Sequence, residues 1–285
     1  MTNKICLFTG ATSGIGKAAA IELAKLNYTF ILTARSEEKG VKLADKLKKK
    51  YKVQGEFIKA DISSLSDVKH LADNVKQKYN RIDVLINNAG LRIYDYQKSA
   101  DGIELTFATN HLGHFYLTIL LMELLKNSDS ARIINVSSSA HPGNKIDFDV
   151  IVNPKQYDRK KAYGQSKLAN VLFTYELARR LSNSKITANA IDPGGVATNF
   201  AWNEGLVPWL KHKIYYILKR KLLTPKQGAN TIIYLASSSE VEGITGKYFH
   251  LRKEKISSPE SYDETSAKKL WELSLKLCGL NNSIS

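Results

Sequence analysis

The sequence predicts a single doubly wound α/β domain of the Rossmann type over residues 1–285, with a seven-stranded, mainly parallel sheet and helices on both faces. Short β-branched apolar runs alternate with longer helical patterns along the whole chain. A glycine-rich turn directly follows the first of these runs, and no Pro/Gly/Ser-rich linker or internal repeat divides the chain. Strand–helix alternation implies parallel strands joined by right-handed crossovers. A hydrophobic content of 43% supports one sizeable core.

Apolar periodicity sets the expected elements in order. The strands are expected at 4–9, 28–34, 55–60, 82–87, 131–137, 186–191 and 246–251. The helices are expected at 14–27, 36–50, 64–79, 103–126, 160–183, 225–237 and 262–278. The third helix shows the pattern well, because its apolar residues form one stripe: Leu65, Val68, Leu71, Ala72 and Val75.

Composition narrows the class of protein. Cys6 and Cys278 lie at opposite ends without metal-ligand spacing, so we expect no metal site and a buried thiol at Cys6. No signal peptide precedes the first strand and no apolar stretch is long enough to span a bilayer, so we expect a cytoplasmic protein. The net charge of +15 is large, but much of the lysine lies in helix-like segments such as 42–52. A solvated helix face explains it better than nucleic acid, for which no zinc-finger or RNA-binding signature is present.

Ligands of such sheets bind at the carboxyl ends of the strands. The first strand ends in "TGATSGIG" (9–16), which places Gly10, Gly14 and Gly16 before the first helix. Glycine allows a tight turn and a close phosphate approach, and a helix N-terminus attracts anions. The spacing departs from G-x-G-x-x-G, and a purely structural turn would explain two of the glycines. Three glycines between one strand and one helix favour a dinucleotide site.

The next two strands end in candidate cofactor-binding residues, and the first of these favours NADP. Arg35 stands where an NAD site usually has an acidic residue, and a guanidinium suits a 2′-phosphate. The alternative is a solvated arginine at a helix start. Asp61 follows the third strand and either contacts the adenine or serves a helix N-cap or first turn.

In "NNAG" (87–90), we expect Asn87 to brace adjacent strands and Gly90 to let the chain pass close to a cofactor.

Further polar groups follow the remaining strands. Serines 137–139 end the fifth strand, Asn110 interrupts a helical pattern, and "DPGGVAT" (192–198) forms a turn after the sixth. Tyr163 and Lys167 are four residues apart, so they share one helix face. Taken alone, that pair is better explained as ordinary helix surface.

In this order, "TGATSGIG", "NNAG", "NVSS", "YGQSK" and "DPGGVAT" resemble the short-chain dehydrogenases/reductases, and the resemblance covers nearly the whole chain. The segments "DGIELTFATNHLGHFYLT" and "YGQSKLANVLFTYELARRL" resemble the retinol dehydrogenase-like branch. A catalytic tetrad is implied: Tyr163 as general acid/base, Lys167 favouring its phenolate and binding the nicotinamide ribose, Ser138 orienting the substrate oxygen, and Asn110 holding a relay water. The family pattern assigns the serine role to the second serine of "NVSS".

The same resemblance implies a set of cofactor-binding residues, and Arg35 favours NADP(H) as the cofactor. Thr198 would hold the nicotinamide carboxamide. The full expected set is Gly10, Ser13, Gly14, Ile15, Gly16, Arg35, Asp61, Ile62, Asn88, Ala89, Gly90, Tyr163, Lys167, Pro193, Gly194, Val196 and Thr198. His141, close to the serines, is expected to shape the pocket rather than to act chemically.

Residues 195–224 are expected to form the substrate lid. Within it, 207–223 reads as a basic amphipathic helix, which suits either a peripheral membrane contact or a lid whose apolar face covers the pocket. The implied substrate is an apolar aldehyde, ketone or alcohol, retinoid-like or lipid-derived. The alternative function is a non-catalytic dinucleotide-binding or sensory protein on the same fold. Pairing of 103–126 and 160–183 between subunits would give a homodimer, and burial within one chain would use the same residues.

Overall fold

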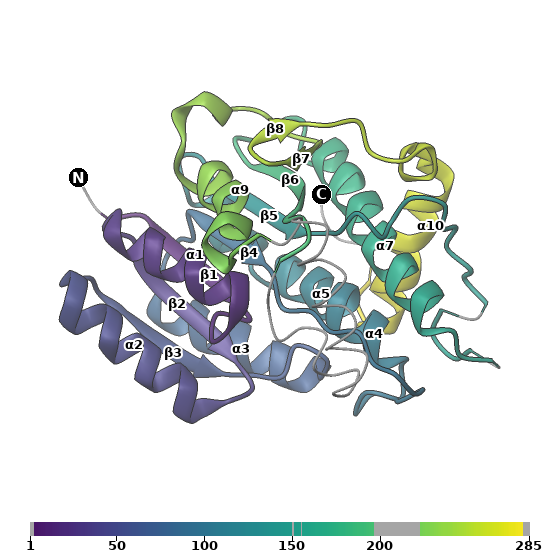
Figure 1. The fold of residues 1–285 in the computed structure, drawn as a ribbon, viewed down its shortest axis with the longest axis horizontal. Helices are drawn as coiled ribbons and strands as arrows, with labels where there is room; N and C mark the ends of the chain where they lie inside the picture. Colours follow the sequence, from purple (N-terminus) through teal and green to yellow (C-terminus); the bar gives the residue numbers. More distant parts are fainter. Residues whose placement is uncertain (1–2, 150, 155, 197–222, 282–285) are drawn as a thin grey trace.

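The computed structural model describes residues 3–149, 151–154, 156–196 and 223–281, and Figure 1 shows a central sheet with helices packed around it. In this described part the sheet has eight strands in the order β3-β2-β1-β4-β5-β6-β7-β8. All neighbouring pairs are parallel except β7 and β8, which are antiparallel. The doubly wound Rossmann-type fold expected from the sequence is therefore confirmed.

The strands agree closely with those expected. Their bounds are β1 (Ile5–Thr9), β2 (Thr29–Ala34), β3 (Gly55–Lys59), β4 (Val84–Asn87), β5 (Arg132–Val136), β6 (Thr187–Asp192), β7 (Lys247–His250) and β8 (Lys253–Glu254). The chain order reverses between β1 and β4, which are neighbours in the sheet. In folds of this type, that switch point is where a ligand sits, beyond the carboxyl ends of the strands.

The helices cover both faces of the sheet (Figure 1). They are α1 (Gly14–Lys25), α2 (Glu37–Tyr51), α3 (Leu65–Lys78), α4 (Leu105–Phe107), the π-helix η1 (Ala108–Leu112), α5 (Gly113–Leu120), α6 (Met122–Lys126), α7 (Arg159–Arg180), α9 (Pro225–Ser237), the short 3₁₀ turns η3 (Ser239–Val241) and η4 (Pro259–Tyr262), and α10 (Glu264–Leu277). None of the described helices is long and apolar enough to cross a membrane.

Alternation along the strands builds two apolar cores. Leu7 packs in the core shared with α3, α5, α7 and α10, whereas its neighbour Phe8 packs in the core shared with α1, α2 and α9. Side chains of a strand point alternately to opposite faces, so a sheet covered on both sides reads as a continuous apolar run. The thiol of Cys6 is buried, as expected. On α7, Phe173 packs against Trp271 of α10, so much of the apolar surface of α7 is buried within one chain.

Two details differ from the sequence-based expectation. The sheet has an eighth strand, because the chain turns back after β7 through Leu251 and Arg252, both at positive φ (50° and 64°). Hairpin turns of this kind normally use Asn or Gly, so these residues gave no signal. The single helix expected at 103–126 is instead divided by the π-helix η1. Just after η1, Gly113 packs against the backbone of Ile62 so closely that a Cβ would overlap it.

Candidate active site

The turn after β1 is shaped for a close approach of backbone to ligand. Gly10 and Gly14 adopt positive φ (70° and 50°), which glycine tolerates without strain. A Cβ on Gly10 would lie 2.8 Å from the Cα of Ala89, and one on Gly16 would strike the carbonyl oxygen of Gly10. Ser13, the N-cap of α1, makes no side-chain capping bond, so no side chain competes for the first amides of this helix. Ile15, the next residue of the glycine-rich segment, lies in the first turn of helix α1.

A hydrogen-bonded bridge ties this turn to the end of β4. The Asn88 side-chain amide donates to the carbonyl oxygen of Thr9 (2.8 Å). The backbone amides of Asn88 and Ala89 both donate to the Thr9 hydroxyl (2.9 and 3.0 Å). Asn87 donates to Asn135 Oδ1 (2.8 Å) and Thr118 Oγ1 (3.0 Å), which confirms its expected bracing role. The structure thus brings the two predicted cofactor segments, 9–16 and 88–90, together at the switch point.

Residues at the ends of β2 and β3 flank this turn. Arg35 is exposed directly after β2, and the Gly10 amide donates to the carbonyl oxygen of Thr33 (2.8 Å), two residues before it. Asp61 Oδ1 accepts from the amide and hydroxyl of Ser63 (2.9 and 2.8 Å). These hydrogen bonds match the first-turn role predicted for Asp61. An adenine contact of Asp61 and a cofactor contact of the buried Ile62 both stay predictions.

Lys167 reaches the same edge of the sheet from α7. Its Nζ lies 5.7 Å from the centroid of the Tyr163 ring and donates to the carbonyl oxygen of Val136 (3.0 Å), the last residue of β5. A Cβ on Gly90 would lie 3.2 Å from Asn110 Oδ1 and at an ordinary contact distance of 3.5 Å from this Nζ, so the glycine leaves room mainly for the Asn110 side chain. Burial lowers the pKa of Lys167 to about 8, because the charged form is desolvated.

The three serines after β5 have different environments. The Ser137 hydroxyl is buried and donates to the carbonyl oxygen of Lys167 (2.7 Å), and Ser139 is exposed. Ser138 is half-buried between them, and its hydroxyl accepts from the Ala140 amide (3.2 Å). Its backbone oxygen accepts from His141 Nδ1 (2.8 Å), whose Nε2 accepts from the Ser258 amide (3.1 Å). His141 therefore holds the loop in place, and the catalytic role of Ser138 stays a prediction.

Asn110 lies in the π-helix, a type of helix often found at functional sites. Its side-chain oxygen accepts from the Leu91 amide (2.8 Å), and its amide group donates to the Leu91 carbonyl (3.0 Å) and to Ser166 Oγ on α7 (2.9 Å). The side chain therefore clamps the loop after β4 to α7. The relay water predicted for Asn110 stays a prediction.

Buried His114 was missed as a functional residue. Its Nε2 lies 2.9 Å from the Thr9 hydroxyl and its Nδ1 lies 3.1 Å from the Asn110 carbonyl oxygen. The Asn110 carbonyl can only accept, so Nδ1–H donates to it. In the neutral ring, Nε2 then accepts from the Thr9 hydroxyl, which also lies 3.3 Å from the Ile86 carbonyl. Burial lowers the pKa of His114 to about 4, which agrees with this neutral form. The sequence signal that could have found His114 is its position four residues after Asn110, which places both on one face of a helix.

Arg92 was missed as well. Its guanidinium carbon lies 5.6 Å from the centroid of the Tyr163 ring. A cation two residues after the glycine of "NNAG" was the signal that could have found it.

The turn after β6 is described in part. Gly194 has φ of 79°, and its amide donates to Asp192 Oδ1 (2.9 Å). A Cβ on Gly228 of α9 would lie 3.3 Å from Ile15, and it would also crowd Val196, so two predicted cofactor residues converge there. Pro193 begins this turn. Thr198 and most of the expected lid, 197–222, lie outside the described residues.

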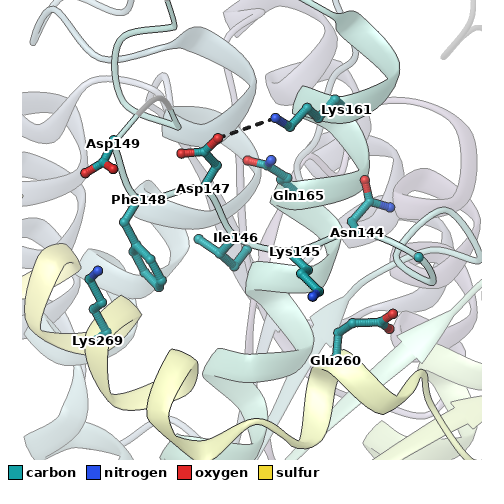
Figure 2. A pocket seen from close by; sticks show the side chains of 11 residues that line it. Asn144, Lys145, Ile146, Asp147, Phe148, Asp149, Lys161, Gln165, Glu260 and Lys269 are labelled. Carbon is teal, nitrogen blue, oxygen red and sulfur yellow. Dashed lines mark hydrogen bonds and ion pairs between the residues drawn. The ribbon is translucent and has the colours of Figure 1, made fainter.

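Figure 2 shows the side chains that line a pocket of about 640 Å³. It is lined by the loop 143–149 with Lys161, Gln165, Glu260 and Lys269, and Lys161 pairs with Asp147 across it (3.4 Å). At 3.6 residues per helical turn, positions 161 and 165 of α7 point away from the side that carries Tyr163. This pocket is therefore distinct from the substrate site expected beside Tyr163.

Comparisons with known proteins agree with this fold and indicate a family for the chain. The family model of the short chain dehydrogenases matches residues 4–206. Human retinol dehydrogenase 14 is 40% identical over 98% of this chain and 88% of its own length. An uncharacterised protein from Mycobacterium paratuberculosis has a TM-score of 0.79 at 32% identity, over 99% of this chain and 95% of its own. The Pseudomonas aeruginosa RhlG/NADP complex has a TM-score of 0.70 at 25% identity, over 92% and 97%.

Proposed function

Since the chain belongs to the short-chain dehydrogenase family, in its retinol dehydrogenase-like branch, we propose that it is an NADP(H)-dependent oxidoreductase that interconverts an apolar aldehyde or ketone, retinoid-like or lipid-derived, and its alcohol. The observation that carries the proposal is the placement of Lys167 Nζ 5.7 Å from the Tyr163 ring, at the carboxyl end of β5, where it donates to the Val136 carbonyl. A phenol beside a buried ammonium group is suited to exchange a proton with a carbonyl oxygen.

The residues of the β1 turn fit a dinucleotide. Gly10 and Gly16 lack the Cβ atoms that would block the backbone, and the first amides of α1 point at the place a pyrophosphate would occupy. Gly14, Ser13 and the 88–90 segment would line the same site. When bound there, NADPH would supply the hydride for carbonyl reduction.

The chain's own side chains divide the remaining work. Tyr163 would donate its proton to the carbonyl oxygen as charge develops there, and Ser138 would donate a hydrogen bond to the same oxygen. The Lys167 ammonium group would stabilise the resulting phenolate, more strongly than in water because the lysine is buried. Asn110 and His114 would keep the loop after β4, the π-helix and α7 in register.

The proposed preference for NADP rests on Arg35. It is exposed directly after β2, whose Thr33 carbonyl accepts from the Gly10 amide of the dinucleotide turn. A guanidinium group there suits a 2′-phosphate, which NAD lacks. The similar fold of RhlG, solved with NADP, supports the same choice.

The function is tested by initial rates with a panel of apolar aldehydes and ketones, with NADPH and NADH compared for each. We expect reduction with NADPH favoured at least tenfold in catalytic efficiency, and Arg35→Ala to remove most of that preference. Lys42→Ala, which removes an exposed cation further along α2, is the matched control and should keep it. Equal efficiency with both cofactors would refute the role of Arg35, and no turnover of any carbonyl would refute the oxidoreductase.

A further inference from the structure

The pocket beside the N-terminal half of α7 contains a buried polar side chain that the fold leaves without a partner. Gln165 lines this pocket (Figure 2), and the residue is only 3% exposed. Its side-chain amide makes no hydrogen bond among the described residues, whereas the amide of Asn170, on the same helix, donates to the Val136 carbonyl (3.0 Å). Buried polar groups are nearly always hydrogen-bonded, so we expect Gln165 to find its partner in the pocket.

Glu260 brings a second unpaired group to the same pocket from the 3₁₀ turn η4. The residue is half-buried, and its Oε2 is buried without a hydrogen-bond partner among the described residues. The pKa of this carboxyl is lowered, chiefly by the nearby Ser258 hydroxyl, so the group is ionised at neutral pH and can only accept hydrogen bonds. Two elements far apart in the sequence therefore turn unused polar atoms toward one space.

The loop that forms the other wall of the pocket is fixed by its own contacts. The Asn144 side-chain amide donates to the carbonyl oxygens of Ala140 (2.9 Å) and His141 (3.2 Å). A Cβ on Gly164 of α7 would lie 2.5 Å from both polar atoms of the Asn144 side chain, so a glycine is needed where the helix meets this loop. His141 Nε2 accepts from the Ser258 amide (3.1 Å), which ties the loop to η4. These contacts hold the pocket open between the loop, α7 and η4.

The size and charge of the pocket suit a small neutral molecule. Its volume of about 640 Å³ lies within the range of small-molecule sites. Three lysines and three acidic residues line it, so their formal charges cancel; they are Lys145, Lys161, Lys269, Asp147, Asp149 and Glu260. Two of the lysines already have partners, because Lys161 pairs with Asp147 (3.4 Å) and Lys269 Nζ lies 4.5 Å from the centroid of the Phe148 ring.

The unused atoms of Gln165 define which polar group a ligand must carry. The side chain offers one carbonyl oxygen and one NH₂ group, which a primary carboxamide matches with two parallel hydrogen bonds. The second N–H of such a ligand suits an acceptor such as Glu260. A carboxylate could only accept and would be repelled by Glu260, and an ammonium group would leave the NH₂ of Gln165 unpaired. Ile146 and Phe148 offer apolar surface to the body of the ligand.

We propose that this pocket is a second ligand-binding site, which takes a small neutral molecule with a primary carboxamide on an apolar body. The side of α7 that carries Gln165 faces away from Tyr163, and the inference does not depend on the proposed oxidoreductase function.

Matched ligands test the proposal. Binding to the full chain is measured by ligand-observed NMR titration with saturating NADP, which would fill a nicotinamide site and keep an amide from binding there. The probes are benzamide, N,N-dimethylbenzamide, which lacks the N–H donors, and benzoate, which has a charge in place of the amide. We expect a millimolar dissociation constant for benzamide, as is usual for so small a molecule, and at least fivefold weaker binding of the other two probes.

Two variants locate the binding in this pocket. Gln165→Met keeps the length of the side chain and removes its hydrogen-bonding groups, so benzamide should bind at least fivefold more weakly. Ile146→Trp fills the pocket from the loop and leaves α7 unchanged, so it should weaken benzamide at least as much and keeps the test decisive if Gln165→Met does not fold. Gln77→Met, which replaces an exposed glutamine on α3, is the matched control and should leave binding unchanged.

The opposite results are equally distinct. No binding of benzamide at tens of millimolar, or equal binding of the three probes, would mean that water alone serves Gln165 and would overturn the proposal. Binding of benzamide that neither pocket variant weakens would place it elsewhere on the protein and would overturn the proposal as well.

Discussion

Thr9 and Thr33 offer a matched test of the hydrogen bonds that build the site. Both are fully buried, and they pair across neighbouring strands in the sheet. The Thr9 hydroxyl accepts from the amides of Asn88 and Ala89 and lies 2.9 Å from His114 Nε2. The Thr33 hydroxyl has no hydrogen-bond partner among the described residues. Replacing each threonine by the isosteric valine keeps the shape and removes the hydroxyl.

The expected costs differ because only Thr9→Val leaves other groups unpaired. It strands two half-buried amides and one buried ring nitrogen, and each lost partner costs roughly 1–3 kcal/mol, with the amides at the lower end. We expect the free energy of unfolding to fall by about 3–5 kcal/mol. For Thr33→Val we expect no loss, because the valine removes a buried hydroxyl that gains nothing from folding.

Urea unfolding of both variants and the parent protein measures these changes, with the midpoint compared at unchanged slope. Cofactor affinity should also weaken in Thr9→Val, because its hydroxyl joins the dinucleotide turn to the 88–90 segment. Losses below about 1 kcal/mol in Thr9→Val, or equal losses in the two variants, would show that this network does not stabilise the site.

Three further predictions concern charge and space. Burial lowers the pKa of Lys167 to about 8, so the ammonium group is lost as pH rises through that value, and kcat/KM for carbonyl reduction should fall there; a flat profile into the strongly alkaline range would contradict this. Burial lowers the pKa of His111 to about 3 and of His114 to about 4, against 6.5 in the unfolded chain. The unfolded chain then binds more protons between pH 6.5 and about 4, so the free energy of unfolding, measured by urea titration, should fall on acidification through this window by several kcal/mol; constant stability there would contradict it. Gly16→Ala should weaken NADPH binding at least tenfold in a fluorescence titration, because its Cβ would meet the Gly10 carbonyl, and unchanged affinity would show that the turn yields.

Much of the fold follows from the sequence because its signals are local. The seven expected strands and the turn glycines are defined by short apolar runs and by residue type, and the structure reproduces them. Strand β8 was missed because Leu251 and Arg252 make its turn without the usual turn residues. The π-helix 108–112 has no local signal in the sequence, and the close packing of Gly113, just after it, joins residues 51 positions apart.

In the candidate site, too, residues with a local sequence signal were predicted and residues defined by distant contacts were not. Tyr163 and Lys167 were found because four residues on a helix fix their proximity, and the order of the motifs supplied the rest. The positions of His114 and Arg92 beside the site were missed because they depend on contacts with Thr9 and with Tyr163, distant in sequence. Three consecutive serines looked equivalent until Ser137 was seen to donate to the backbone of α7.

The central claim is that Tyr163 exchanges the proton in a carbonyl reduction. The most direct measurement is the turnover of Tyr163→Phe with NADPH and an aldehyde that the parent protein reduces, alongside the affinity of both proteins for NADPH. Loss of the hydroxyl removes the proton donor and leaves the ring in place, so we expect turnover to fall at least ~100-fold while NADPH affinity stays within a few-fold. Turnover within a few-fold of the parent protein would contradict the assignment.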